Sequence, residues 1–342
     1  MEKISQGLAD LANKRFSELL SEGFRLFFKN YRTLILPLAF FQIIIIILDT
    51  LFLTDLKVYV NSLGINLVDL MASMVEDIPI TASEMNLLSL YFILTFVLLF
   101  LQNLIGAMII TIAMCSVSDY LLKKHQGVET NFYASFKSAF NKKMFIVIFI
   151  VGICLPVSAI LLYIPAIAVF SIFIFLVFTY NIEEIDKPIS EARAITKGLN
   201  NKFKIIGVFI FNFIVIFIFS FLFNSVIDLF LDPDILAYNY NLWLAPGTRN
   251  YGLIILYQIL LSIVNILLTP LFICLLTVFF ASLKAKKDLS FQYQRNYYTV
   301  KEEQTIISQN KSRVYCPYCG ILINNVKRYC PSCGENLSQL NK

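Results

Sequence analysis

Residues 144–182 read MFIVIFIVGICLPVSAILLYIPAIAVFSIFIFLVFTYNI and contain no Asp, Glu, Lys or Arg. A bilayer core about 30 Å thick needs about 20 apolar residues per helix, so this stretch is long enough for two membrane spans. Tyr163 and Pro165 lie near its middle, where a tight turn would join the two helices. We therefore expect a helical hairpin with spans at about 144–162 and 164–181.

The whole chain is nearly as apolar as this stretch. Of its 342 residues, 58% are hydrophobic and only 15% are charged, whereas an ordinary soluble domain is about 25% charged. The mean hydropathy is +0.73. These values exclude a water-soluble globular protein and indicate an integral membrane protein. The single His also excludes any mechanism that needs two histidines.

Four more segments are long and apolar enough to span a bilayer. They are residues 33–53, 88–118, 204–231 and 251–282. With the hairpin they predict an all-α polytopic domain of six transmembrane helices over residues 33–283, preceded by a cytoplasmic amphipathic segment at 1–32. That segment is basic and lacks an apolar core followed by a cleavage site, so we expect the N-terminus to be kept.

The distribution of basic residues predicts the orientation. Six spans place both termini on one side, and all 28 Lys and Arg residues except Lys57 and Arg249 fall on that side. Cytoplasmic segments carry the excess of Lys and Arg in membrane proteins. We therefore expect a multi-pass protein of the plasma membrane with cytoplasmic N- and C-termini. The first outer loop, 54–86, is acidic instead.

An amphipathic pattern recurs before three of the spans. In residues 16–31, Phe24, Phe27 and Phe28 share one face and Arg25 and Lys29 the other. Such a helix is typical of one that lies on the membrane surface.

Similar apolar stripes precede the third and fifth spans, with basic residues beside them. The stripes are Phe132, Phe136, Ala139 and Phe140, then Ile189, Ala192, Ile195 and Leu199. Together they predict three helix-plus-hairpin units that start near residues 16, 130 and 188. The alternative is that any cytoplasmic loop ending at a membrane can look amphipathic.

The composition changes after Leu283. Residues 284–313 are polar without sustained periodicity, which indicates a linker. Residues 314–342 contain two Cys-x-x-Cys-Gly sequences, whose cysteines are Cys316, Cys319, Cys330 and Cys333. Four thiolates complete the tetrahedral Cys₄ shell that structural Zn²⁺ prefers, and they leave no open position for catalysis. The residues between the pairs, 321–329, would form a β-hairpin.

The alternatives to one structural Zn²⁺ are two disulfides or iron. The predicted cytoplasmic location favours zinc, because thiols stay reduced there. Cys115, Cys154 and Cys274 lie in spans and are expected to be small core residues.

Two resemblances extend this interpretation. The CPYCG…CPSCG tail resembles the small zinc ribbons at the ends of archaeal and bacterial proteins. Residues 16–282 resemble a group that includes the membrane domain attached to some glycerophosphodiester phosphodiesterases. The similar residues are FSELLSEGF at 16–24, FKNY at 28–31, Ile164-Pro165 and ISEARAITKG at 189–198.

The second resemblance implies a six-span fold more than an activity. The phosphodiesterase domain itself is not in this sequence, since its catalysis needs a pair of histidines and His125 stands alone.

Polar residues within the spans are the remaining candidates for a site. Asp49 and Asp228 are intramembrane acids, which are often functional, but each lies close to the outer end of its span. Amide side chains in the spans would either bond between helices or line a cavity. They are Gln42, Gln102, Asn103, Asn212, Asn224, Gln258 and Asn265. His125 is expected to be solvated in its basic loop.

No Ser/His/Asp set, phosphate loop or cluster of acids points to an enzyme. The first hypothesis is therefore a non-enzymatic adaptor or regulator that presents the zinc ribbon to a cytoplasmic protein partner. The alternative is a transporter or lipid-handling protein with a polar intramembrane cavity. A nucleic-acid partner is not favoured, because the few basic residues of the ribbon suit anionic lipid headgroups equally well.

Overall fold

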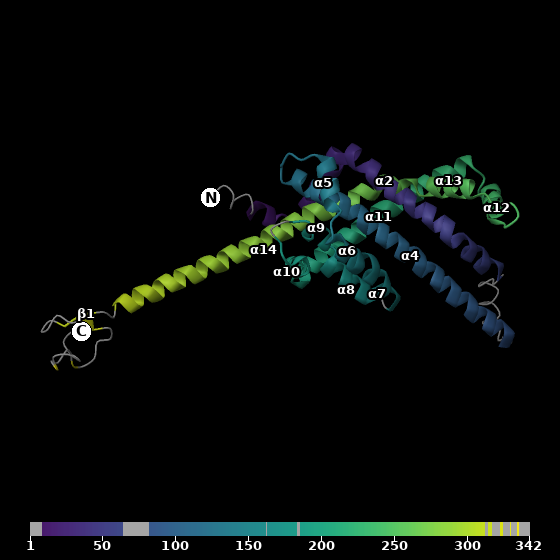
Figure 1. Ribbon diagram of the computed structural model, residues 1–342. Helices are drawn as coiled ribbons and strands as arrows, with labels where there is room; N and C mark the ends of the chain where they lie inside the picture. The colour runs from purple at the N-terminus through teal and green to yellow at the C-terminus, as the bar shows by residue number, and fades with distance from the viewer. Residues whose placement is uncertain are drawn as a thin grey trace. The chain divides into compact units, whose positions relative to one another are not determined.

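A computed structural model (Figure 1) describes most of the chain. The described residues are 9–63, 82–161, 163–182, 185–311, 314–316, 322–323, 329 and 334. The chain divides into two compact units. One is Asp10–Lys284, called here the membrane unit, and the other combines Met1–Ala9 with Ala285–Lys342.

Every regular element that the structure describes within the membrane unit is a helix. In order these are α2 (Phe16–Ser62), α4 (Ala82–His125), α5 (Phe132–Ala139), α6 (Met144–Val147), the π-helix η1 (Ile148–Cys154), α7 (Leu155–Leu161), α8 (Tyr163–Phe173), α9 (Leu176–Thr179), α10 (Pro188–Ile195), α11 (Leu199–Phe230), α12 (Pro233–Leu244), α13 (Tyr251–Leu261) and α14 (Ile263–Lys311), of which the last continues beyond this unit.

Four of the described helices are long and apolar enough to cross a membrane. They are Phe16–Ser62, Met85–His125, Leu199–Phe230 and Ile263–Phe291. The pair Phe132–Ala139 and Met144–Ser158, bent by 71°, would be a fifth. The expectation of a helical, multi-pass membrane protein is therefore confirmed, with four or five described helices that could span a membrane.

Two of the predicted spans are interrupted, and one of them overlaps the helix Ile263–Phe291 counted above. Residues 164–181 contain a turn at Ile174 and Phe175, between α8 and α9, and residues 251–282 break at Ser262, between α13 and α14.

The span predicted at 144–162 is irregular, and Pro156 explains why. Proline lacks an N–H, and its ring clashes with the carbonyl four residues earlier in a regular α-helix. The wider π-helix η1 ends two residues before Pro156. Within η1, Gly152 lies against Met108 of α4, where an added Cβ would be 3.0 Å from the Met108 Cα. The π-helix therefore coincides with a close approach between α4 and this span.

The surface helix predicted at 16–31 is not a separate helix. It forms the beginning of α2, which continues without a break through Pro37 to Ser62. Leu19 and Leu26 are buried in the core rather than facing lipid. A sequence window of 16 residues could not reveal this, because Glu18, Arg25 and Lys29 do remain exposed.

The second and third predicted surface helices are separate elements, α5 and α10. Their inward residues include Ala139 in α5 and Ala192 and Ile195 in α10, all buried. Leu199, predicted to continue the third stripe, is exposed at the start of α11. The three predicted units therefore do not begin alike.

Residues 271–283 of α14 form the centre of the core. Phe279 packs edge-on against Phe16 of α2 with ring centroids 5.2 Å apart, and Phe280 stacks on Phe178 of α9 at 4.8 Å. Aromatic pairs of this kind add roughly 0.5–1.5 kcal/mol beyond the burial of their area. The core thus joins elements from both ends of the membrane unit's sequence.

The helix α12 was not expected from the sequence. Asp232 caps its N-terminus by accepting a hydrogen bond from the Asp234 N–H, and Pro233 occupies the first turn. Its Tyr240 ring lies 4.9 Å from that of Tyr257 in α13. The segment lies between the predicted spans 204–231 and 251–282, and its Asp-Pro start is a helix signal.

Phe27 and Phe28 form a matched pair of neighbours on α2, since Phe27 is 6% exposed and Phe28 is 72% exposed. Replacing Phe27 by Ala should lower the free energy of unfolding by about 3–5 kcal/mol, the usual loss for a buried aromatic residue. Phe28→Ala should change it by less than about 1 kcal/mol. Thermal unfolding of the purified protein in detergent would measure both, and equal effects would contradict the packing of α2.

The second unit contains the end of α14 and a short antiparallel pair of strands, β1 (Val314–Tyr315) and β2 (Leu322–Ile323). Val314 pairs with Ile323 and Tyr315 with Leu322. The linker predicted at 284–313 is helical rather than irregular as far as Lys311. Residues 284–311 contain no Gly or Pro, so nothing in them breaks a helix.

Candidate functional site

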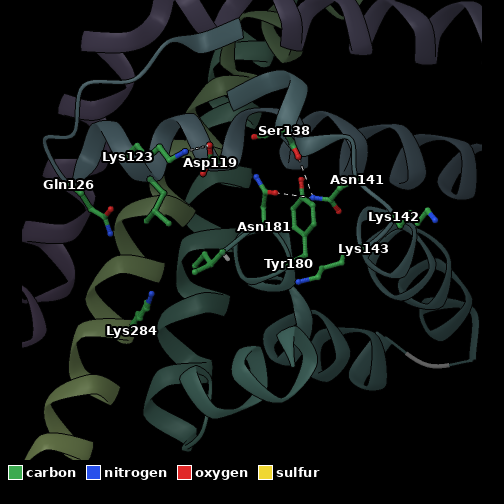
Figure 2. Close-up of a pocket in the computed structure, with 12 residues that line it drawn as sticks. Asp119, Lys123, Gln126, Ser138, Asn141, Lys142, Lys143, Tyr180, Asn181 and Lys284 are labelled. Carbon is green, nitrogen blue, oxygen red and sulfur yellow. Dashed lines mark hydrogen bonds and ion pairs between the residues drawn. The ribbon is translucent and has the colours of Figure 1, made fainter. Parts of the chain in front are cut away.

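One cavity of the membrane unit has a volume of about 870 Å³ (Figure 2). Its walls come from the C-terminal end of α4, the bend between α5 and α6, the residues after α9, and α14. The lining residues are Asp119, Leu122, Lys123, Gln126, Ser138, Asn141, Lys142, Lys143, Tyr180, Asn181, Ile182 and Lys284. We call this space the basic pocket.

Buried hydrogen bonds hold the walls of the basic pocket in place. The Tyr180 hydroxyl is within hydrogen-bonding distance of two backbone oxygens, those of Cys115 in α4 at 3.2 Å and Ala139 in α5 at 3.0 Å. Asn141 donates from Nδ2 to Asn181 Oδ1 at 2.9 Å, while its Oδ1 accepts the Met144 N–H at 3.2 Å. These bonds join three segments that are far apart in the sequence.

The charge of the basic pocket is positive. Asp119 pairs with Lys123 at 2.7 Å, so this carboxylate is already neutralised. Lys142, Lys143 and Lys284 have no carboxylate partner among the residues that the structure describes. Such a pocket can attract and hold an anion.

A second, smaller cavity of about 140 Å³ lies within the membrane unit between α2, α4, α11 and α14. Gln42 and Asn212 line it, together with Thr269 and apolar residues. Asn212 is only 9% exposed, and its Oδ1 has no hydrogen-bond partner in the described part of the chain. The structure therefore brings together two of the seven amide residues that the sequence singled out.

Other members of that set are satisfied locally or exposed. Asn103 donates to the Leu99 carbonyl of its own helix, and Gln258 donates to the Tyr240 hydroxyl at 3.1 Å. Asn224 and Asn265 are exposed. These residues do not extend the cavity.

The two candidate acids do not form a site together. Asp49 pairs with Lys57 on the same helix at 2.5 Å, which neutralises its charge. Asp228 is exposed near the end of α11. Near Asp49, Asp55 forms an ion pair with Arg249, across 194 positions of sequence.

The prediction that His125 is solvated is wrong. Its side chain is 7% exposed, and its Nε2 lies 3.3 Å from Glu22 Oε1. The other oxygen of Glu22 accepts from Lys14 at 2.6 Å. The reason is that the beginning of α2 packs beside the end of α4 instead of lying apart on the membrane surface.

The four predicted zinc ligands are described only in part. Cys316 directly follows β1 and is 1% exposed, whereas Cys319, Cys330 and Cys333 lie outside the described residues. Gly334, which follows the fourth cysteine, has φ of +76°, a conformation that glycine adopts readily. Among the residues that the structure describes, no three His, Cys, Asp or Glu side chains gather closely enough to hold a metal.

The basic pocket was missed by sequence reasoning. In the sequence, Lys123 and Lys284 indicate only the orientation, and Lys143 also borders the apolar stripe at 132–140, yet the three lysines lie beside the second, sixth and third predicted spans. Comparisons of the chain with protein-family models, with curated proteins and with solved structures find no match. Function must therefore be argued from these sites alone.

Proposed function

We propose that this protein is a non-enzymatic, six-span protein of the plasma membrane that presents a cytoplasmic zinc ribbon to a protein partner. The observation that carries the proposal is the arrangement of Cys316, Cys319, Cys330 and Cys333 in two Cys-Pro-x-Cys-Gly sequences. Two such pairs suit a tetrahedral structural Zn²⁺, which has no open position for a reaction. The ribbon is then a binding module rather than a catalytic one.

Local structure around the first and last cysteines supports this proposal. The strands β1 and β2 lie before and after the first cysteine pair in the sequence and are antiparallel. Gly334, directly after the last cysteine, has a positive φ, which glycine adopts readily. A module this short cannot build a large apolar core, and bound metal would supply the free energy that folds it.

The proposed topology counts α8 with α9, and α13 with α14, as single spans. Contacts in the structure join segments that the charge distribution assigns to the same side. Asp55 meets Arg249 at the predicted outer ends, and Asn141 meets Asn181 at the predicted cytoplasmic ends. Both termini are then cytoplasmic, where the thiols of the ribbon stay reduced.

The orientation predicts which positions are reachable from outside the cell. A cysteine introduced at Ser62 should be labelled in intact cells by an impermeant maleimide, whereas one at Ser308 should be labelled only after permeabilisation. The unmodified protein provides the baseline for its native cysteines. Labelling of the 308 position alone in intact cells would refute the topology.

Affinity purification in mild detergent tests the adaptor role. The variants to compare are the wild type, a chain ending at residue 310, Cys316→Ser/Cys319→Ser, and the control Cys154→Ser, which alters a cysteine within the membrane unit. A specific protein recovered with the wild type and the control, but lost with the other two, is the expected result. Identical recovery from all four would exclude a partner that binds the ribbon.

The small cavity favours a second candidate function, a transporter or lipid-handling protein. A buried polar atom without a partner usually has an explanation in a bound water, ion or ligand, and Asn212 Oδ1 is such an atom in the described part of the chain. A small molecule or lipid that co-purifies with the wild type and with the chain ending at 310, but not with Asn212→Leu, would support this candidate. Asn224→Leu is the matched control, because Asn224 is an exposed residue of the same helix.

A further inference from the structure

We propose that the basic pocket is a binding site for a phosphate group, carried either by an anionic lipid headgroup or by a small phosphorylated molecule. This inference does not depend on the zinc ribbon, since every residue that lines the pocket belongs to the membrane unit. It rests on the charge of the pocket, the way its walls are built, and its size.

The positive charge of the basic pocket is the first observation that supports an anion site. After Asp119 and Lys123 neutralise each other, Lys142, Lys143 and Lys284 contribute positive charge with no described carboxylate to balance it. Lysine is a common phosphate ligand that acts as a compact point charge with three donors. Asp119 is the one acid among the described residues of the lining, so an anion is the complementary ligand.

The arrangement of the pocket walls is the second observation. Figure 2 shows Lys123, Lys143 and Lys284 on three separate segments around one space, with Asn181 and Tyr180 between them. The Tyr180 hydroxyl lies within hydrogen-bonding distance of the Cys115 and Ala139 carbonyl oxygens, so it ties the residues after α9 to α4 and α5. Walls that are already in place lose less conformational entropy when a ligand binds.

The volume of the pocket is the third observation. The value of about 870 Å³ lies within the range of about 300–1,000 Å³ that is usual for small-molecule sites. The volume therefore leaves room for a phosphate with an attached glycerol or similar group, which is what both proposed sources share.

Orientation alone could place lysines at this end of the membrane unit. Lys29 and Lys137 illustrate that case, because both are exposed and neither lines the pocket. Lys143 is also exposed but lines the pocket, and Lys284 is half-buried in its wall. Replacing Lys29 and Lys137 therefore provides a control with the same change of net charge.

The experiment uses the full-length protein in a neutral detergent. Isothermal titration with glycerol 3-phosphate and with dioctanoyl phosphatidylglycerol measures binding, and dioctanoyl phosphatidylcholine is the zwitterionic comparison. Lys143→Gln/Lys284→Gln should weaken binding by about tenfold or more, since hydrogen bonds to charged groups contribute on this scale. Lys29→Gln/Lys137→Gln should change it by less than about twofold, as expected for exposed charges.

The two phosphate probes distinguish the possible sources of the phosphate group. Binding of phosphatidylglycerol without glycerol 3-phosphate identifies a lipid site, and binding of both at similar strength identifies a site for soluble phosphorylated molecules. Binding should return in Lys143→Arg/Lys284→Arg, which keeps the charge and shows that the Gln variant lost affinity and not its fold. The proposal is overturned if neither probe binds saturably, or if the control variant loses as much affinity as the pocket variant.

Discussion

Replacing Cys316 and Cys319 by Ser should remove the bound zinc entirely. The wild-type protein, purified under reducing conditions, should contain about one equivalent of Zn²⁺ per chain, as expected for a single Cys₄ site. Two of the four thiolates are lost in the variant, and the two that remain cannot complete the tetrahedral shell. Elemental analysis of the purified proteins measures the difference.

The control for this prediction is Cys154→Ser, which should keep its zinc. Because metal binding and folding are coupled in such small modules, a chelator should also make residues 314–342 of the wild type sensitive to protease, while the membrane unit stays resistant. A wild-type protein without zinc, or a Cys316→Ser/Cys319→Ser variant that keeps it, would contradict the ribbon.

Replacing Gly23 by Leu should strongly destabilise the membrane unit. Gly23 of α2 lies against Leu275 of α14, and an added Cβ would come 2.6 Å from the Leu275 Cδ2 atom and 3.2 Å from its Cα. The side chain can move, but the backbone cannot without separating the two helices. Small residues allow such close approach between helices in membranes.

The expected loss for Gly23→Leu is about 3 kcal/mol or more, at or above the upper end for overpacked cores. Gly106→Leu is the matched control, because an added Cβ at Gly106 meets nothing within 4 Å. Gly106→Leu should leave the unfolding temperature in detergent nearly unchanged, while Gly23→Leu should lower it sharply or prevent purification. Similar behaviour of the two variants would show that α2 and α14 do not pack as described.

The elements that could be predicted from the sequence are those fixed by local pattern. Runs of apolar residues predict the long helices, since a span needs only length and composition. The cysteine spacing is also a local pattern, and the zinc site that it indicates stays a prediction. By contrast, the π-helix beside Pro156 depends on how the chain accommodates a proline against α4, and a hydropathy window does not contain that information.

The basic pocket shows the limit of sequence reasoning more clearly. Lys123, Lys143 and Lys284 are separated by long stretches of sequence, and only the packing of α4, the α5–α6 bend and α14 brings them together. His125 was misjudged for the same reason. Its neighbours in the sequence are basic and polar, but its neighbour in the fold is Glu22 of α2.

The ion pairs of Lys57 and Arg249 also bear on how the chain crosses an energised membrane. A potential that is negative inside opposes the outward transfer of a cation by about 2.3 kcal/mol per 100 mV. In the proposed orientation, Lys57 and Asp49 sit on one helix and cross as a neutral pair, so their transfer requires no net electrical work. Arg249 forms its ion pair with Asp55, which precedes it in the sequence. The same potential favours the outward transfer of the Asp55 carboxylate by as much as it opposes that of the Arg249 guanidinium.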